Sequence, residues 1–253
     1  MENLTFFGRM LFAIAVMAFG IEHFAFGHAL TALILIPDTT PAFSLWVYSL
    51  GLVLLGAGVC IAAEIRTQLI ATLLGILFLI LYLIFHFPRE IANPKDPGAW
   101  TAAFELIGMS GGAFMLAKIY KSKSNSALGY LYRTGVYLFA STFVVIGIQH
   151  ILYADFIVTV IPAWIPGRIF WAYFVGIAFF ATALALITRI RVGLTTTLLG
   201  IMFLTWVLIL HGPRVFANVH TETEWTSLFI ALAMGGISLM IAGSPAKIYS
   251  AGS

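Results

Sequence analysis

Charged residues are scarce in this chain: 9% of its 253 residues are Asp, Glu, Lys or Arg, whereas 61% are hydrophobic. Soluble domains carry about 25% charged residues, so this chain has too few to cover an ordinary water-facing surface. Cysteine is nearly absent too, because Cys60 is the only one in the sequence. A single cysteine excludes an intramolecular disulfide and any metal site built from several thiolates. The composition therefore predicts a protein that folds in lipid.

Long apolar runs make up much of the sequence. A bilayer core about 30 Å thick needs around 20 apolar residues in a helix, and eight stretches meet this length. They are residues 8–27, 46–65, 69–87, 100–118, 134–153, 168–187, 193–211 and 224–242. The first lacks a small-residue cleavage site, so we expect a spanning helix there and not a removable signal peptide. The sequence predicts an all-α integral membrane protein with eight transmembrane helices.

Basic residues divide unevenly between the two sides of these spans. One side carries nine of them: Arg9, Arg66, Lys118, Lys121, Lys123, Arg133, Arg189, Arg191 and Lys247. The other side carries four: Arg89, Lys95, Arg168 and Arg214. Because loops rich in Lys and Arg stay in the cytoplasm, we expect both termini there, in a bacterial inner membrane. The net charge of +3 is then a sign of orientation in the bilayer and does not indicate nucleic-acid binding.

The sequence also contains an internal repeat. An offset of 125 residues superimposes Pro37, Pro41, Trp46 and Gly51 on Pro162, Pro166, Trp171 and Gly176, and His86, Pro88 and Arg89 on His211, Pro213 and Arg214. Nearer the start of each copy the offset is 127, which aligns GIEH at 20–23 with GIQH at 147–150. Each copy has an even number of spans, so both face the same way around an axis along the membrane normal. We expect two tandem parallel-repeat four-helix bundles, at 1–120 and 134–253, joined by a cytoplasmic linker at 121–133.

Ionisable residues gather at the expected outer ends of the spans. The candidate catalytic residues of the first copy are Glu22, His23, His86, Arg89 and Glu105. The candidate cofactor-binding residues of the second copy are Gln149, His150, His211 and Arg214. The proline of each H-x-P-R segment is expected to help end its helix. Ionisable groups at membrane depth are costly and are functional candidates by default, although histidines at helix ends also simply reach toward the interface.

A metal ion, a haem and a quinone make different demands on this layer. A metal site needs three or four convergent ligands, and the second copy has Gln149 and Ile230 where the first has Glu22 and Glu105, so no metal is expected. Two histidines could hold a haem, but they lie at the rim of the bundle and not within its apolar depth. A quinone or another small amphipathic ligand fits better, because His or Arg can hydrogen-bond its carbonyl and a nearby acid can carry the proton.

Two outer loops, 28–45 and 154–167, are apolar, contain prolines and are too short to span the bilayer. Either they cover the polar layer as lids or re-entrant segments, or they rest in the interface. The second alternative requires no contact with the candidate residues.

Three features together resemble the DoxX-like family of bacterial membrane proteins. They are the G-x-x-H that closes the first helix, the proline-containing apolar loop before a Trp, and the Gly-rich four-helix unit, and they occur twice, at about 8–118 and 134–242. The resemblance implies a four-helix membrane bundle. It also implies a quinone-linked redox role beside a partner subunit, because the name-giving member is linked to a membrane thiosulfate:quinone oxidoreductase. A small-molecule transporter and a non-catalytic assembly or binding factor remain the alternatives.

Overall fold

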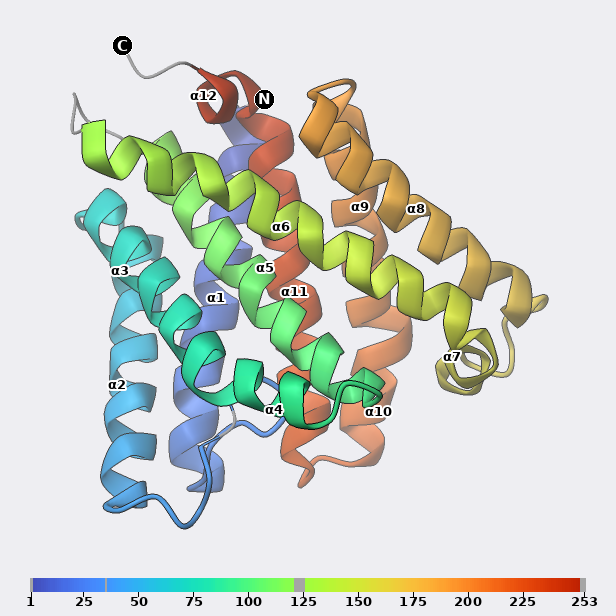
Figure 1. Ribbon diagram of the computed structural model, residues 1–253, viewed down its shortest axis with the longest axis horizontal. Helices are drawn as coiled ribbons and strands as arrows, with labels where there is room; N and C mark the ends of the chain where they lie inside the picture. The colour runs from blue at the N-terminus through green and yellow to red at the C-terminus, as the bar shows by residue number, and fades with distance from the viewer. Residues whose placement is uncertain (1, 35, 121–125, 251–253) are drawn as a thin grey trace.

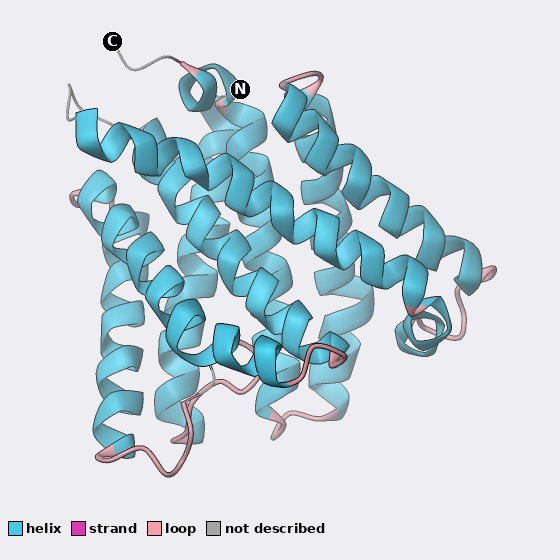
Figure 2. Ribbon diagram, viewed as in Figure 1, coloured by secondary structure: helices cyan, strands magenta, loops and turns pink. Residues whose placement is uncertain are grey.

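The computed structural model describes residues 2–34, 36–120 and 126–250, and all regular structure in these ranges is helical (Figure 2). The elements are α1 (Glu2–Phe26), α2 (Phe43–Ala62), α3 (Thr67–Leu81), η1 (Tyr82–His86), α4 (Phe87–Ala92), α5 (Pro97–Ile119), α6 (Ser126–Leu152), α7 (Ala154–Val160), α8 (Arg168–Thr188), α9 (Val192–Trp206), η2 (Val207–His211), α10 (Gly212–Ala217), α11 (Glu222–Gly243) and α12 (Pro245–Tyr249). Within the described ranges, eight helical segments are long and apolar enough to cross a membrane. The predicted all-α membrane fold with eight spans is confirmed.

The spans run alternately between two ends of the bundle (Figure 1). We call the end that carries Glu2 and α12 the terminal end, and the opposite end, where α1, η1, α6 and η2 finish, the histidine end. Helix α6 begins at Ser126, so residues 126–133 of the expected linker are helical. Residues 121–125, with Lys121 and Lys123, lie outside the described ranges.

The two copies of the repeat are interlocked. Helix α1 packs along α11, the last span of the other copy, and α6 packs in the equivalent way along α5. Figure 1 shows α5 and α11 in the middle of the bundle, and these two spans are the most deeply buried. The first helix of each copy, α1 or α6, therefore packs most extensively against the last helix of the other copy. Its second neighbour is the next span of its own copy, α2 or α8.

Glycines make this interlocking possible. A Cβ on Gly8 of α1 would lie 2.4 Å from the carbonyl oxygen of Gly236 in α11. At the equivalent contact of the other copy, a Cβ on Gly135 of α6 would lie 2.7 Å from the carbonyl oxygen of Gly111 in α5. Small residues allow membrane helices to bring their backbones together. The same contact is thus built twice, once for each copy.

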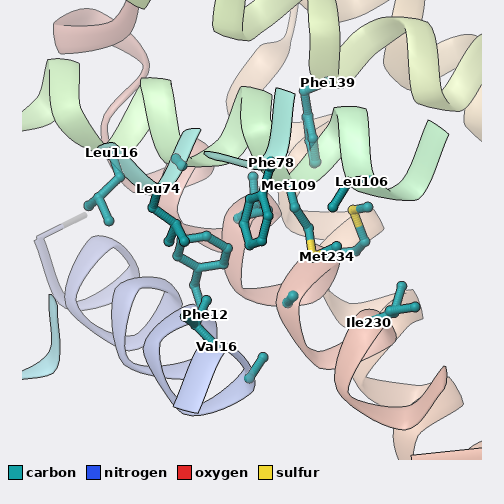
Figure 3. Close-up of a cluster of buried hydrophobic side chains, with 14 of the residues drawn as sticks. Phe12, Val16, Leu74, Phe78, Leu106, Met109, Leu116, Phe139, Ile230 and Met234 are labelled. Atoms are coloured by element: carbon teal, nitrogen blue, oxygen red, sulfur yellow. The ribbon is translucent and has the colours of Figure 1, made fainter. Parts of the chain in front are cut away.

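The apolar core lies where these helices cross. Figure 3 shows side chains from five helices meeting there, among them Phe12 of α1, Phe78 of α3, Met109 of α5, Phe139 of α6 and Met234 of α11. Met109 and Met234 are equivalent positions of the repeat. So are Gly112 and Ile237, and a Cβ on Gly112 would lie within 2.5 Å of the Ile237 side chain. Contact between equivalent residues places this part of the core on the axis that relates the two copies.

The prolines of the H-x-P-R segments do not end their helices, and the prediction that they do was wrong. Each is preceded by a π-helical turn, η1 or η2, and the helix then continues as α4 or α10. The N–H of Phe87 donates to the carbonyl of Tyr82, and that of Gly212 to the carbonyl of Val207. A single wide turn of this kind lets a helix pass a proline, because it relaxes the usual i→i−4 pattern where the proline lacks an N–H.

Candidate functional site

A buried group of carboxyl and hydroxyl side chains joins the two copies at the histidine end. The hydroxyl of Thr226 in α11 lies 2.5 Å from Oε2 of Glu22 in α1, and 2.9 Å from Oε1 of Glu222. Thr31, in the loop after α1, donates to Oε2 of Glu222 at 2.9 Å. Glu22, Glu222 and Thr226 are 5%, 7% and 0% exposed. We call these four residues the carboxyl cluster.

The single hydroxyl of Thr226 faces two carboxyl groups. Thr226 has one hydroxyl hydrogen and can donate it to only one of its two carboxyl neighbours. The other contact is a hydrogen bond only when that carboxyl carries a proton and donates to the threonine oxygen. Thr226 thus bridges two buried carboxyl groups, one from α1 and one from α11. The remaining oxygen of Glu22, Oε1, is buried without a partner in the described part of the chain.

The contact between α6 and α5 is the neutral equivalent of this one. Gln149 replaces Glu22, and Thr101 of α5 replaces Thr226. Thr101 donates to Oε1 of Gln149 at 2.8 Å, and Nε2 of Gln149 donates to the carbonyl of Pro97 at 2.8 Å. Pro97 is the repeat equivalent of Glu222. The amide of Gln149 thus makes both contacts without any ionisable group, whereas the two carboxyl groups lie at the contact of α1 with α11.

His23 follows Glu22 and is fully buried against α2. A Cβ on Gly51 would lie 2.8 Å from the Cβ of His23, so this glycine provides the room for the imidazole. Nδ1 of His23 lies 2.7 Å from the carbonyl of Phe19. A carbonyl only accepts, so Nδ1 carries the hydrogen. Nε2 is then left as a buried acceptor with no partner among the described residues.

His86 shows the opposite tautomer. Its Nε2 lies 2.9 Å from the carbonyl of Leu33 in the loop after α1, so Nε2 carries the hydrogen. Nδ1 is buried and has no hydrogen-bond partner in the described ranges. Two imidazoles at the histidine end, 0% and 1% exposed, therefore each present one unused nitrogen. Buried polar atoms of this kind are rare and need an explanation.

The loop after α1 seals this site. Ala29, Leu30, Leu33 and Ile34 are buried in the core, although the loop has no long regular element. Thr31 holds Glu222 and the Leu33 carbonyl holds His86, so one short segment contacts both groups. This is the lid alternative. The corresponding loop of the second copy forms α7 at the periphery instead, where Phe156 is 64% exposed, as in the interfacial alternative.

The histidines of the second copy are less enclosed. Nδ1 of His150 lies 2.9 Å from the carbonyl of Ile146, which repeats the contact of His23. His150 and His211 are half-buried, and Nδ1 of His211 has no partner among the described residues. A Cβ on Gly176 would lie 3.0 Å from the Cβ of His150, as Gly51 does for His23. Equivalent residues thus hold equivalent imidazoles, but no buried loop covers the second pair.

Arg89 and Arg214 form local ion pairs at the histidine end. Arg89 contacts Asp96 at 3.1 Å, and Nε of Arg214 contacts Glu224 at 2.9 Å. Both arginine side chains are about 40% exposed, at 40% and 44%. Asp96 also caps α5 by accepting the N–H groups of Gly98 and Ala99. The Ala99 N–H, with help from Arg89 and Gly98, lowers the pKa of Asp96 below its ordinary value despite the opposing effect of burial.

Glu105 stands apart from the other candidates. It lies on α5, which packs mainly against α6 and α3, whereas Glu22 and His23 lie on α1. It is half-buried and has no hydrogen-bond or ion-pair partner in the described part of the chain. No three His, Cys, Asp or Glu residues in the described ranges are grouped so that they could hold a metal ion. The four acids and histidines of the first copy therefore do not converge on one ion.

Sequence reasoning missed four members of the site: Thr31, Glu90, Glu222 and Thr226. Glu90 is 4% exposed and accepts from the Tyr82 hydroxyl at 3.1 Å. In the second copy these two positions are Val215 and Val207. The alignment of the two copies could have revealed this polar pair, because two valines stand at the same positions in the second copy. The repeat offers no such signal for Glu222, because its equivalent is Pro97.

Comparison with known proteins gives no match: no protein-family model, curated protein or solved structure resembles this chain closely enough to be reported. The resemblance to DoxX-like proteins thus stays a prediction from the residues quoted above.

Proposed function

We propose that this chain is a quinone-binding membrane protein that works with a redox partner subunit, as a DoxX-like protein would. The observation that carries the proposal is the pair of unused ring nitrogens, Nε2 of His23 and Nδ1 of His86, both buried in a layer that also holds the carboxyl cluster. A quinone ring has two oxygens: as hydroquinone hydroxyls they donate to a neutral imidazole nitrogen, and as quinone carbonyls they accept from a protonated one. Its apolar ring and tail suit a site within a lipid-facing bundle.

The proposed chemistry is a proton-coupled reduction. Two electrons from the partner subunit and two protons convert the quinone to a hydroquinone. His23 and His86 hold the two oxygens: as neutral rings they accept the hydroquinone hydroxyls, and as imidazolium ions they donate to the quinone carbonyls. Glu22, adjacent to His23 in sequence, supplies or takes up a proton through the bond that it shares with Thr226 and Glu222. Gln149, which stands at the position of Glu22 in the second copy, cannot take this role, and the histidines of that copy serve in binding.

Ligand entry requires the loop after α1 to move, because its residues Leu30, Leu33 and Ile34 are fully buried over the histidine end. In the described ranges, two hydrogen bonds connect this loop to Glu222 and His86. The Thr31 hydroxyl donates to Glu222, and the Leu33 carbonyl accepts from His86. Lids that close over a bound ligand also exclude water from its redox chemistry. The loop therefore supports a site that opens to the ligand and closes during reaction.

Binding of a short-tailed quinone to purified protein in neutral detergent tests this function. Titration is followed by isothermal calorimetry on the wild type and on His23→Ala, His86→Ala and the matched control His220→Ala, whose histidine is exposed in the loop before α11. Loss of a buried hydrogen bond weakens binding by about tenfold, so His23→Ala and His86→Ala are each expected to show this loss and the control none. Wild-type affinity in both site variants would overturn the proposal.

One observation favours a transporter instead. Glu105 is a carboxyl group without a described partner, eight residues into α5 and so about 12 Å along the span. A lone acid at that depth is typical of proton-coupled carriers. Solute uptake into proteoliposomes that lack any redox partner, driven by a pH gradient and lost in Glu105→Gln, would support this second function. Quinone binding that is insensitive to Glu105→Gln would speak for the first.

A further inference from the structure

A cationic cavity lies at the terminal end, far from the histidines. Its volume is about 300 Å³ and it opens between the ends of α5, α6, α8 and α12. Six of the residues that line it are Lys118, Arg133, Val136, Tyr137, Arg189 and Tyr249. None of the residues that line the cavity is acidic. The cavity thus gathers three positive charges with no carboxylate in its wall.

The two arginines of this cavity are available for a ligand. Neither Arg133 nor Arg189 forms an ion pair with a carboxylate in the described part of the chain. The guanidinium carbon of Arg189 lies 5.3 Å from the centre of the Tyr249 ring. Lys118 has another task, since its Nζ donates to the carbonyls of Ile248 and Ser250 and so fixes α12 beside the cavity. Burial raises the pKa of Tyr249 to about 12, so this wall stays neutral.

At the equivalent position of the first copy, the arginine is paired with a carboxylate. There Arg9 is 1% exposed, contacts Glu64 at 2.8 Å and donates to the last carbonyls of α2, at Ile61 and Ala62. The repeat equivalents of Arg9 and Glu64 are Val136 and Arg189. Glu64 and Arg189 even share a left-handed backbone, with φ of 58° and 65°. The second copy has therefore lost the buried arginine and reversed the sign of its partner.

The replacement of Arg9 by Val136 and of Glu64 by Arg189 opens space in the second copy and leaves its arginine without a helix end to cap. Val136 is short and lines the cavity, whereas the long side chain of Arg9 fills the equivalent space in the first copy. The cap on α8 passes to Tyr249, whose hydroxyl donates to the carbonyl of Leu186 at 2.7 Å. Leu186 is the repeat equivalent of Ile61, the carbonyl that Arg9 caps. Arg189 thus has no helix end to satisfy, and it stands beside a cavity of ligand size.

We propose that this cavity binds a phosphate group at the membrane surface. Guanidinium forks match the geometry of phosphate oxygens, and Tyr137, 54% exposed, offers a hydroxyl beside them. The cavity lies at the ends of the spans, which is the depth of lipid headgroups, and basic pockets between spans are typical binding places for anionic lipids. The phosphate belongs either to an anionic phospholipid or to a free phosphate compound, and the experiment separates these sources.

The test uses the full chain in neutral detergent with two probes, dioctanoyl phosphatidylglycerol and inorganic phosphate. Arg133→Gln/Arg189→Gln removes the two free charges. Val136→Arg/Arg189→Glu rebuilds the ion pair of the first copy and is expected to fold, because the chain already contains that arrangement. Arg191→Gln is the matched control, since Arg191 is exposed, two residues from Arg189 and outside the cavity wall.

Each basic group at such a surface contributes roughly fivefold in affinity, so Arg133→Gln/Arg189→Gln is expected to bind the lipid about 25-fold more weakly. Val136→Arg/Arg189→Glu lowers the net charge of the wall by one and fills the cavity with an arginine side chain, so it is expected to bind at least about fivefold more weakly. Arg191→Gln is expected to bind like the wild type. Lipid binding that inorganic phosphate does not displace identifies a headgroup site. Equal affinity for inorganic phosphate identifies a site for a free phosphate compound. Binding that survives in both double variants, an equal loss in Arg191→Gln, or no binding of either probe to the wild type overturns the proposal.

Discussion

The hydroxyl of Thr226 lies 2.5 Å from Oε2 of Glu22, and this contact joins the last span of the second copy to the first span of the first copy. It exists because α1 packs along α11 and not only along its own copy. The corresponding contact, Thr101 with Gln149, joins α5 to α6. Two contacts related by the repeat thus lie at the histidine end of both interlocked helix pairs, and the one that contains Glu22 and Glu222 has groups that can hold a proton, whereas the other has an amide and a backbone carbonyl.

Removal of the shared hydroxyl is expected to destabilise the protein. In Thr226→Val, Glu22 loses its described partner and Glu222 loses one, which costs about 1–3 kcal/mol. Glu22→Gln is expected to remain near wild-type stability, because Gln149 already makes the equivalent contact. Unfolding in sodium dodecyl sulfate, followed by circular dichroism, measures both. Equal destabilisation by the two substitutions would contradict the role given to Thr226.

The close approach of the copies gives a sharper prediction of stability. Gly8→Ala places a Cβ 2.4 Å from the Gly236 carbonyl, so α1 and α11 must separate, at a cost of about 2 kcal/mol or more. Gly56 lies in α2 with nothing within 4 Å of an added Cβ. Gly56→Ala is therefore expected to be neutral or slightly stabilising, as alanine is the better helix former. The same unfolding assay compares them, and equal stability of the two variants would refute the contact.

Much of the fold could be predicted because length and hydropathy decide whether a helix spans a bilayer. Those properties do not decide which spans are neighbours. Helices that are apolar on every side offer no polar face to orient them, so the pairing of α1 with α11 depends on glycines such as Gly8 and Gly236, whose partners the sequence does not name. The wide turns at η1 and η2 also escaped prediction, because a proline both ends helices and is accommodated in them.

The candidate site was predictable in part for the same reason. His23, His86 and Glu22 stand out as ionisable residues in apolar runs, and the structure buries all three. Glu222 and Thr226 enter the site only through the pairing of the copies, so they looked like ordinary loop and helix-start residues. Glu105 is equally conspicuous in the sequence, yet its helix faces α6 and α3. A sequence shows how deep an ionisable residue lies along its span, but it does not show which ionisable residues come together in the fold.

Acid is expected to weaken the start of α5. The pKa of Asp96 is lowered from its ordinary value of 3.8 by the groups that bind its ionised form. Its stabilising effect is therefore complete above that value and disappears as the pH falls through the lower folded pKa. Asp96→Asn is expected to reduce stability at pH 7 and to make no difference well below pH 3.8. Thermal unfolding of both proteins across this range measures it, and a constant difference at all pH values would contradict the assignment.

The hydrogen bond between Tyr82 and Glu90 can be tested with a double variant, because the second copy has valines at both positions. Tyr82→Val leaves Glu90, 4% exposed, with neither carboxyl oxygen bonded to a described residue, since Oε1 already lacks a partner. We expect this to cost about 1–3 kcal/mol. Tyr82→Val/Glu90→Val recreates the Val207 and Val215 of the second copy, so no polar group is stranded and most of the loss is expected to be recovered. A double-mutant cycle on unfolding free energies gives the coupling. Additive losses would show that the two side chains act independently, and that the second copy is not a guide to the first.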